Sequence, residues 1–382
     1  MTHLLAALAC LGHLVLMVGS HNLLYGLRAP KWFSGLVHVV HALAVLALPI
    51  GLVAGWGWSL AGLRDRPVML AYLALCLAAL FVLLPLVSLA RALRPDPLRY
   101  ERREVVDLTR QLGRKPVGLG NHPFLARLPG NGIFHVEFVE AALALPGLPP
   151  ALDGLTVLHL SDLHFHGTPD REWFAAIIER CNAWKPDIVA LTGDVIDSPT
   201  HHRWILPLLG RLRWGVAGFA ILGNHDHYFE PEVVRRRLRR LGFTVLVNEW
   251  AMATVRGTPV AVVGNEYPWL EPEPDLAGMP EGFKLCLSHT PDNFAWAARH
   301  GMDLVLAGHV HGGQIRLPLI GPVVMPSRYG RRFDQGGFRD GKTVMVVSRG
   351  LSGEEPVRYN CLPEAMLLTL RCQPLPSEVH HA

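Results

Sequence analysis

The sequence predicts an α/β fold in which two stacked sheets are flanked by helices, preceded by three transmembrane helices. Two observations support this prediction. Three apolar runs, at residues 4–24, 34–55 and 68–90, are each long enough to cross a bilayer. From residue 133 onward, short apolar runs alternate with turn residues and a few helical stretches, which is typical of stacked sheets with crossover helices.

Residues 1–95 are predicted to form a membrane domain with three transmembrane helices. Of the 382 residues in the chain, 50% are hydrophobic, and the excess lies in this part, which has almost no acidic side chains. A cleaved signal peptide is the rival interpretation of the first apolar run. It is the weaker one, because no Lys or Arg precedes the run and two further runs follow.

Four histidines lie in or near the predicted spans: His13, His21, His38 and His41. Two interpretations are open. The side chains face the helix bundle or the membrane interface, or they form a functional site inside the membrane, where ionisable groups are costly and rare.

The charges next to the predicted spans give the orientation. One side carries Arg28, Lys31, Arg91, Arg94, Arg99, Arg102 and Arg103. The opposite loop carries only Arg64 and Arg66, offset by Asp65. Because basic residues concentrate on the cytoplasmic side of a membrane protein, the C-terminal domain is predicted to be cytoplasmic.

Residues 96–132 are predicted to be a basic juxtamembrane helix and a linker. Leu98, Val105, Leu108 and Leu112 recur at helical spacing within 98–115. Such a helix either lies along anionic lipid or is a solvated connection. Residues 116–132 are rich in Gly, Pro and Asn, which indicates a connector.

The third predicted domain spans residues 133–375. Strands are expected at 134–145, 155–160, 187–192, 216–222, 243–247, 250–256, 259–264, 283–288, 303–307, 343–348 and 364–370. Helices are expected near 170–184, 231–241 and 292–299. The six cysteines form no C-x-x-C pair, so neither a disulfide framework nor a zinc knuckle is predicted.

Metal-binding side chains follow five of the predicted strands. In chain order they are Asp162 and His164, then G-D-x-x-D at 193–197, G-N-H-D at 223–226, S-H at 288–289 and G-H-x-H at 308–311. Carboxylate, imidazole and amide groups suit a hard or borderline divalent ion. Residues i and i+2 of an extended segment point the same way, so Asp162 with His164, and His309 with His311, can each aim two ligands into one cavity.

This ordered set resembles the calcineurin-like metallophosphoesterase family over residues 155–370. The strings S-H-T-P-D (288–292), A-G-H-V-H-G-G-Q (307–314) and S-R-G-L-S-G-E-E-P-V-R (348–358) are similar to a bacterial branch of it. That branch contains membrane-associated phosphodiesterases and UDP-2,3-diacylglucosamine pyrophosphohydrolases. The resemblance implies a four-layer αββα sandwich and a metal-dependent hydrolase of phosphodiester or pyrophosphate bonds, anchored in a bacterial inner membrane.

The resemblance also implies a role for each residue. Two divalent ions, Mn, Fe or Zn, are expected. One would be held by Asp162, His164 and His311, the other by Asn224, His289 and His309, and Asp194 would bridge both. His225 would protonate the leaving group and Asp197 would orient it. The alternatives are that His225 only binds phosphate and that Asp197 caps a turn.

Elementary chemistry supports these roles. Two ions about 3.5–4 Å apart clamp the attacking and leaving oxygens of an in-line displacement at phosphorus. A bridging carboxylate reduces the repulsion between them. An imidazole held by a carboxylate can donate a proton to the leaving alkoxide, which is typically worth about 10²–10⁴-fold in rate.

Three further segments invite a functional interpretation. Arg328, Arg331 and Arg332 lie in a loop rich in Gly and Pro, and loops of this kind often contact substrate. The arginines of helix 235–240 are expected on a solvated face, with membrane or substrate contact as the alternative. Segment 265–281 is either a lid, a lipid-contacting edge or an ordinary packed loop.

The function expected from the sequence is therefore a membrane-anchored phosphoesterase. Its partners would be the lipid bilayer and a phosphate-containing substrate that is lipid-linked or close to the membrane. The alternatives are a phosphodiesterase of soluble nucleotides or cyclic nucleotides and a non-catalytic scaffold. The net charge of +4 gives no reason to expect nucleic acid, and the sequence does not specify an oligomeric state.

Overall fold

The computed structural model describes residues 2–27, 31–56 and 66–372. The charges of Arg28, Arg64 and Asp65 lie outside these ranges, as do residues 373–375 of the third predicted domain. The chain divides into two compact units, Met1–Pro95 with Arg316–Arg332 and Asp96–Ile315 with Phe333–Ala382. We call them the membrane unit and the catalytic unit, and each is described by itself.

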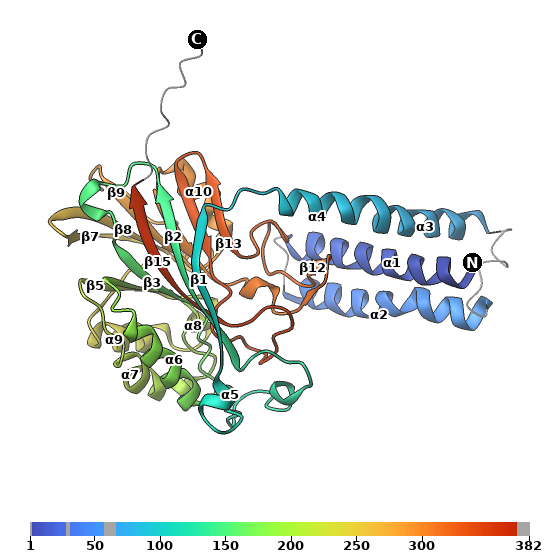
Figure 1. The fold of residues 1–382 in the computed structure, drawn as a ribbon, viewed down its shortest axis with the longest axis horizontal. Helices are drawn as coiled ribbons and strands as arrows, with labels where there is room; N and C mark the ends of the chain where they lie inside the picture. Colours follow the sequence, from blue (N-terminus) through green and yellow to red (C-terminus); the bar gives the residue numbers. More distant parts are fainter. Residues whose placement is uncertain (1, 28–30, 57–65, 373–382) are drawn as a thin grey trace, which may run out of the picture. The chain divides into compact units, whose positions relative to one another are not determined.

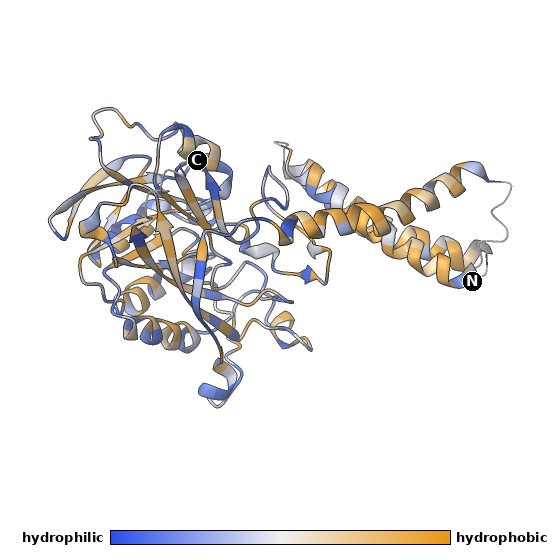
Figure 2. Cartoon of the chain, turned by 45° about the horizontal axis from the view of Figure 1, so that its top comes forward, coloured by the Kyte–Doolittle hydropathy of each residue, from blue (hydrophilic) through white to orange (hydrophobic). Residues whose placement is uncertain are grey.

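The membrane unit contains three long apolar helices (Figures 1 and 2). They are α1 (Thr2–Tyr25), α2 (Lys31–Trp56) and a third helix made of α3 (Pro67–Ala78), η2 (Ala79–Leu83) and α4 (Leu84–Ala92). The π-helical segment η2 ends two residues before Pro85, which has no N–H to continue the helical bonding. All three helices are long and apolar enough to cross a membrane, as predicted.

The remainder of the membrane unit is the segment Arg316–Arg332, which includes the strand pair β11 (Arg316–Leu317) and β12 (Gly321–Pro322). It is fastened to the helices by hydrogen bonds. Nδ2 of Asn22 donates to the carbonyl oxygen of Val323 at 2.8 Å, and Nη1 of Arg91 donates to that of Ile320 at 3.1 Å. The loop after the last metal motif therefore folds with the membrane helices, which lie more than two hundred residues earlier in the chain.

The catalytic unit contains two sheets (Figure 1). The seven-stranded sheet has the order β1-β2-β15-β3-β4-β5-β6, and the six-stranded sheet has the order β13-β14-β10-β9-β8-β7. The first sheet comprises β1 (Leu98–Asp107), β2 (His135–Leu145), β15 (Glu364–Cys372), β3 (Thr156–Leu160), β4 (Ile188–Thr192), β5 (Ala217–Ile221) and β6 (Phe243–Val245). The second comprises β13 (Gly336–Asp340), β14 (Thr343–Val347), β10 (Leu304–Ala307), β9 (Phe283–Ser288), β8 (Thr258–Asn265) and β7 (Trp250–Val255).

The helices of this unit are α5 (Leu108–Gln111), α6 (Arg171–Ala183), α7 (His202–Leu209), α8 (Asn224–Tyr228), α9 (Pro231–Arg240) and α10 (Phe294–Arg299). Side chains alternate along the central strands. Val157 of β3 lies in the core between the two sheets, whereas its neighbour Leu158 lies in the core beneath the helices. Helices α6, α7 and α9 cover that outer face (Figure 1). The predicted arrangement of two stacked sheets flanked by helices is confirmed.

The helix predicted over 98–115 is wrong. Residues 98–107 form the edge strand β1, antiparallel to β2, and only Leu108–Gln111 is helical. The spacing of the apolar residues suggested a helix, but pairing with β2 determines the conformation. The exposed side chains of β1 are mainly charged, and charge on an edge strand discourages pairing with other chains. Helix α7 and strand β13 were also not predicted.

A buried ion cluster joins three strands of the seven-stranded sheet to the segment after β14. Glu137 of β2 accepts hydrogen bonds from Arg103 of β1, at 2.9 Å, and from the buried Arg349. Arg349 also pairs with Glu364, the first residue of β15. Burial alone would raise the pKa of Glu137, but Arg103 and Arg349 outweigh it and hold the pKa below its ordinary value.

The depressed pKa of Glu137 predicts an acid-dependent contribution to stability. A carboxylate of this kind stabilises the fold above its unfolded pKa of about 4.3 and loses this effect as the pH falls through its folded pKa. Glu137→Gln in the full chain is expected to lower the thermal unfolding midpoint at pH 7, with a loss of about 1.5–3 kcal/mol. The wild type and the variant should converge below pH 4.

Glu140→Gln is the matched control, because Glu140 lies on the same strand and, among the described residues, its one ion pair is a 4.0 Å surface contact with Arg102. It should change the midpoint little. Equal effects of the two substitutions, or a Glu137 effect that persists unchanged in acid, would contradict the role assigned to the cluster.

Candidate metal centre

The candidate site lies where the parallel strands of both sheets end. Strands β3, β4 and β5 run parallel in one sheet, and β8, β9 and β10 run parallel in the other. The carboxyl ends of parallel strands meet at one edge of a sheet. The segments that carry Asp162, Asp194 and Asn224 follow β3, β4 and β5, and those that carry His289 and His309 follow β9 and β10.

The backbone turns sharply where these side chains enter the site. Positive φ angles occur at five of the predicted ligands, namely Asp162, His164, Asp194, His309 and His311, with values from 44° to 68°. A left-handed conformation at a residue other than glycine costs roughly 1–3 kcal/mol and persists only where its surroundings enforce it. Such strain gathers at functional sites, and here it occurs at three of the five strand ends that carry predicted ligands, those of β3, β4 and β10.

The predicted ligands form two groups that share one residue. Asp162, His164, Asp194 and His311 make the first group, and Asp194, His289 and His309 make the second. Within each group the ligand atoms lie within 4.8 Å of one another. Asn224 joins the second group, because its Oδ1 lies 3.1 Å from Nε2 of His289. The structure thus brings all seven predicted ligands together around Asp194.

Three of the four imidazoles are oriented by a hydrogen bond from Nδ1. His289 donates to the carbonyl oxygen of Thr192 at 2.7 Å, His311 to that of Ser352 at 3.1 Å, and His164 to the Asp197 carboxylate at 2.8 Å. In the neutral form of each ring, Nε2 then carries the lone pair. This is the arrangement that fixes a histidine for metal binding.

The positions of the predicted ligands suit the binding of metal cations. Nε2 of His164 and Nε2 of His311 are 3.2 Å apart, and two lone pairs at that distance repel unless a proton or a metal ion lies between them. Oδ2 of Asp194 is buried and has no hydrogen-bond partner among the described residues. It lies 3.2 Å from Nε2 of His289 and 3.6 Å from Nε2 of His164. An orphaned carboxylate oxygen between two ring nitrogens is a suitable place for a bridged pair of ions.

Burial and the neighbouring charges shift the pKa values of the predicted ligands. Burial lowers the pKa of His289, but Asp194 outweighs burial and raises it to about 9. Burial raises the pKa of Asp194, but His289 and His225 outweigh it and hold the carboxyl ionised. In contrast, burial lowers the pKa of His309 and His311 to about 3, so both rings are neutral and free to bind metal.

His225 and Asp197 lie beside the first group. Nδ1 of His225 is 2.6 Å from Oδ1 of Asp197, whose other oxygen accepts from His164. Burial lowers the pKa of His225, but Asp194 and Asp197 outweigh it and raise the pKa above its ordinary value. Asp197 therefore orients two histidines at once, whereas the sequence suggested only one. Asp226 binds the backbone N–H groups of Val195, Ile196 and Gly223 and shapes the loop.

Glycine is required where the two sheets approach each other at the site. A Cβ on Gly223 would lie 2.5 Å from Cε1 of His289, and one on Gly193 would lie 2.8 Å from its Nδ1. Gly193 also has a φ of 94°. These two glycines of the G-D and G-N-H-D motifs allow Asp194 and Asn224 to reach the same histidine.

The prediction that the arginines of helix α9 lie on a solvated face is wrong for one of them. Arg235 is buried and donates two hydrogen bonds to Glu266, at 2.9 and 2.8 Å. Glu266 also accepts from the backbone N–H of Leu222, two residues before Asn224. Arg236, Arg239 and Arg240 are exposed, as predicted for this face. Arg235 thus supports the loop that carries Asn224 and is not part of a surface patch.

An aromatic residue covers the second group. The ring of Trp269 lies 4.8 Å from that of His309 and 5.2 Å from that of His289, between ring centroids. It comes from segment 265–281, for which the sequence left a lid and a packed loop open. This part of the segment packs against the candidate centre.

Arg358 is a residue at the site that sequence reasoning did not single out. It is fully buried, and its guanidinium donates to the carbonyl oxygens of His311, Arg349 and Ser352. Ser352 is the residue that accepts from Nδ1 of His311. Arg358 therefore holds both the backbone of His311 and the group that orients its ring. Its place in the string 348–358 was the available signal.

Arg328, Arg331 and Arg332 lie in the membrane unit, within Arg316–Arg332. Nη1 of Arg331 donates to the carbonyl oxygen of Ile320 at 2.6 Å, and the guanidinium of Arg328 lies over the ring of Tyr329. Their contact with substrate stays a prediction.

Comparison with known proteins identifies the family. Residues 155–313 match the family model described as calcineurin-like phosphoesterase. An uncharacterized metallophosphoesterase of Bacillus subtilis (strain 168), YkuE, is 31% identical over 247 residues, covering 62% of this chain and 86% of the relative. This chain belongs to the calcineurin-like phosphoesterase family. The phosphoesterase is accordingly a hydrolase of phosphoester bonds, as its sequence predicted.

Two named relatives of this phosphoesterase differ in activity. Phosphodiesterase YaeI of Escherichia coli (strain K12) is 31% identical over 226 residues, covering 56% of this chain and 81% of YaeI. UDP-2,3-diacylglucosamine pyrophosphatase LpxG of Chlamydia trachomatis serovar D is 24% identical over 288 residues, covering 58% of this chain and 85% of LpxG.

The contacts of Arg358 predict an effect on activity. Arg358→Lys keeps the charge but cannot bind three carbonyl oxygens in one plane. We expect kcat for a phosphodiester to fall about 10–100-fold, with a matching loss of metal affinity, as for other groups that orient a metal ligand. Metal content and steady-state kinetics are measured on the same preparation.

Arg371→Lys is the matched control, because Arg371 is half exposed and its one ion pair within residues 66–372 is with Asp153 at 3.6 Å. This substitution should leave kcat for the phosphodiester and the metal affinity unchanged. Normal metal affinity in Arg358→Lys would show that Arg358 does not position His311.

Proposed function

We propose that this phosphoesterase is a dinuclear metal-dependent enzyme that hydrolyses a phosphodiester or pyrophosphate bond of a lipid-linked or membrane-proximal substrate. The observation that carries the proposal is the convergence of six other donor side chains on Asp194, whose Oδ2 has no hydrogen-bond partner among the described residues. Asp162, His164 and His311 would hold one ion, Asn224, His289 and His309 the other, and Asp194 both. Mn, Fe and Zn suit this mixed nitrogen and oxygen set equally.

The bound ions would supply Lewis acidity toward the phosphate oxygens and a water nucleophile that is deprotonated near neutral pH. The protein side chains would hold these ions and adjust their charge. Asp194 offsets part of the repulsion between the cations. Asn224 contributes a neutral oxygen, so its ion keeps Lewis acidity that a further carboxylate would reduce.

His225 is the proposed proton donor. With Nδ1 held by Asp197, Nε2 is the ring nitrogen left to donate a proton to the leaving oxygen. The raised pKa of His225 favours the protonated ring that this step requires. Asp197 holds the ring and stabilises its charge.

The membrane unit supports the choice of substrate. Three candidate spans fix the enzyme at a bilayer, where lipid-linked phosphates are concentrated. The similarity to LpxG adds a lipid-linked pyrophosphate to the candidates. We place the enzyme in a bacterial inner membrane with the catalytic unit in the cytoplasm, on the basis of the charges next to the spans.

A substrate panel tests the proposal. The full chain in detergent, supplied with Mn²⁺ or Zn²⁺, is assayed on bis(p-nitrophenyl) phosphate, p-nitrophenyl phosphate, a cyclic nucleotide, UDP-diacylglucosamine and phosphatidylglycerol. We expect the soluble diester to be cleaved and a lipid-linked substrate to have the highest kcat/KM. Efficient turnover of the nucleotide with no turnover of lipids would favour the soluble-substrate alternative.

Two variants, assayed on the same substrates, test the proposed roles of Asp194 and His225. Asp194→Ala should bind less metal and show no turnover above background on every substrate. His225→Gln should keep its metal and lose about 10²–10⁴-fold in kcat. His135→Gln is the control, because the side chain of His135 is half exposed and lies 3.9 Å from Asp107, which is not a predicted ligand. Residual turnover in Asp194→Ala would defeat the two-metal proposal.

A further inference from the structure

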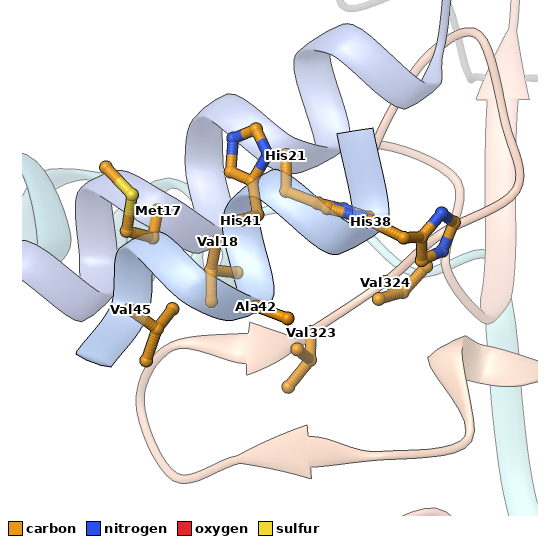
Figure 3. A pocket seen from close by; sticks show the side chains of 9 residues that line it. All are labelled: Met17, Val18, His21, His38, His41, Ala42, Val45, Val323 and Val324. Carbon is orange, nitrogen blue, oxygen red and sulfur yellow. The ribbon is translucent and has the colours of Figure 1, made fainter. Parts of the chain in front are cut away.

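The membrane unit contains a cavity that the proposed chemistry does not use (Figure 3). Its volume is about 210 Å³. It is lined by six apolar side chains and three imidazoles: Met17, Val18, Ala42, Val45, Val323, Val324, His21, His38 and His41. Figure 3 shows the three histidines together above Ala42, Val45 and Val323. The cavity wall is thus mainly apolar, and the three imidazoles form its polar part.

His21 indicates that a ligand belongs in this cavity. The side chain is only 6% exposed, and its Nδ1 has no hydrogen-bond partner within the described residues. In His38 and His41, Nδ1 donates to the carbonyl four residues earlier, at 2.8 Å in both cases. The equivalent carbonyl for His21 belongs to Met17 and accepts from the hydroxyl of Ser20 instead. A buried polar atom without a partner requires an explanation.

The depth of His21 suits the polar part of a lipid. His21 lies four residues before the end of α1, and His38 and His41 lie seven and ten residues after the start of α2. At 1.5 Å per residue these positions are about 6–15 Å from the helix ends. In a hydrocarbon layer about 30 Å thick, each leaflet is about 15 Å deep, so His21 lies in the outer half of one leaflet and His38 and His41 lie deeper in the same leaflet.

The segment that contributes Val323 and Val324 to the cavity wall carries positive charge that suits a phosphate. Val323 and Val324 belong to Arg316–Arg332, a segment with four arginines and no acidic residue. Arg328 and Arg332 are exposed. The same segment is joined by four residues to His311, a proposed metal ligand.

We propose that this cavity binds one acyl chain of an anionic phospholipid, with the lipid phosphate directed toward the three histidines and the arginines of Arg316–Arg332. The occupant is taken from the bilayer that the helices cross. The inference rests on the membrane anchorage in the proposed function and narrows its substrate class to phosphate esters of acyl lipids.

Photochemical labelling tests the site directly. The full chain in lipid nanodiscs is irradiated with phosphatidylglycerol that carries a diazirine in one acyl chain, and adducts are mapped by mass spectrometry. We expect adducts on the lining residues of α1, α2 and 323–324. Ala42→Trp, which fills the cavity, should reduce them at least fivefold. Ala47→Trp is the matched control on the same helix, because Ala47 is exposed and does not line the cavity.

Competition and His21→Phe test the polar part. Unlabelled phosphatidylglycerol should displace the probe, and diacylglycerol with the same chains should do so at least fivefold less well. His21→Phe should weaken that discrimination. Adducts spread evenly along the exposed faces, or equal labelling of Ala42→Trp and Ala47→Trp, would overturn the site, and equal competition by the two lipids would overturn the phosphate assignment.

Kinetics on the same preparations separate this inference from the proposed function. In Ala42→Trp, KM for a lipid phosphodiester should rise at least fivefold, while kcat/KM for bis(p-nitrophenyl) phosphate stays at the wild-type value. An unchanged KM for the lipid would overturn the cavity as a substrate site even if labelling succeeds. Loss of turnover on the soluble diester in the wild type would instead reject the proposed function.

Discussion

The Asp194 carboxylate is the interaction on which the candidate site depends. It belongs to both groups of predicted ligands, and its Oδ1 accepts a hydrogen bond of 2.8 Å from the backbone N–H of His225, the proposed proton donor. One side chain therefore links the two proposed ions and the proposed acid. The strained backbone at Asp194 and the glycines beside it are consequences of bringing that carboxylate to the junction of two sheets.

Much of this arrangement could be predicted from the sequence, because the side chains that make it follow short apolar strands at regular intervals. The three long apolar helices, the two-sheet architecture and the identity of the clustered residues follow from local patterns. The roles of those residues as ligands and acid stay predictions. What the clustering adds is the double use of Asp197, which contacts both His164 and His225.

The remainder depends on contacts between distant residues. Residues 98–107 have helical spacing but pair with β2, and no local pattern reveals that partner. Arg235 occurs in a run of arginines, yet its side chain is buried and forms an ion pair with Glu266. Arg358 holds the loop of His311 from 47 residues away. The segment Arg316–Arg332 interrupts the catalytic unit in sequence and folds with the membrane helices.

The central claim is that a single carboxylate bridges two cations, and electron paramagnetic resonance of the Mn²⁺-loaded protein tests it most directly. Two Mn²⁺ ions bridged by Asp194 should bind per chain and give an exchange-coupled multiline spectrum, which Asp194→Ala should convert to the six-line signal of isolated ions. A wild-type protein that binds one Mn²⁺ per chain, or gives only the isolated signal when fully loaded, would contradict the account.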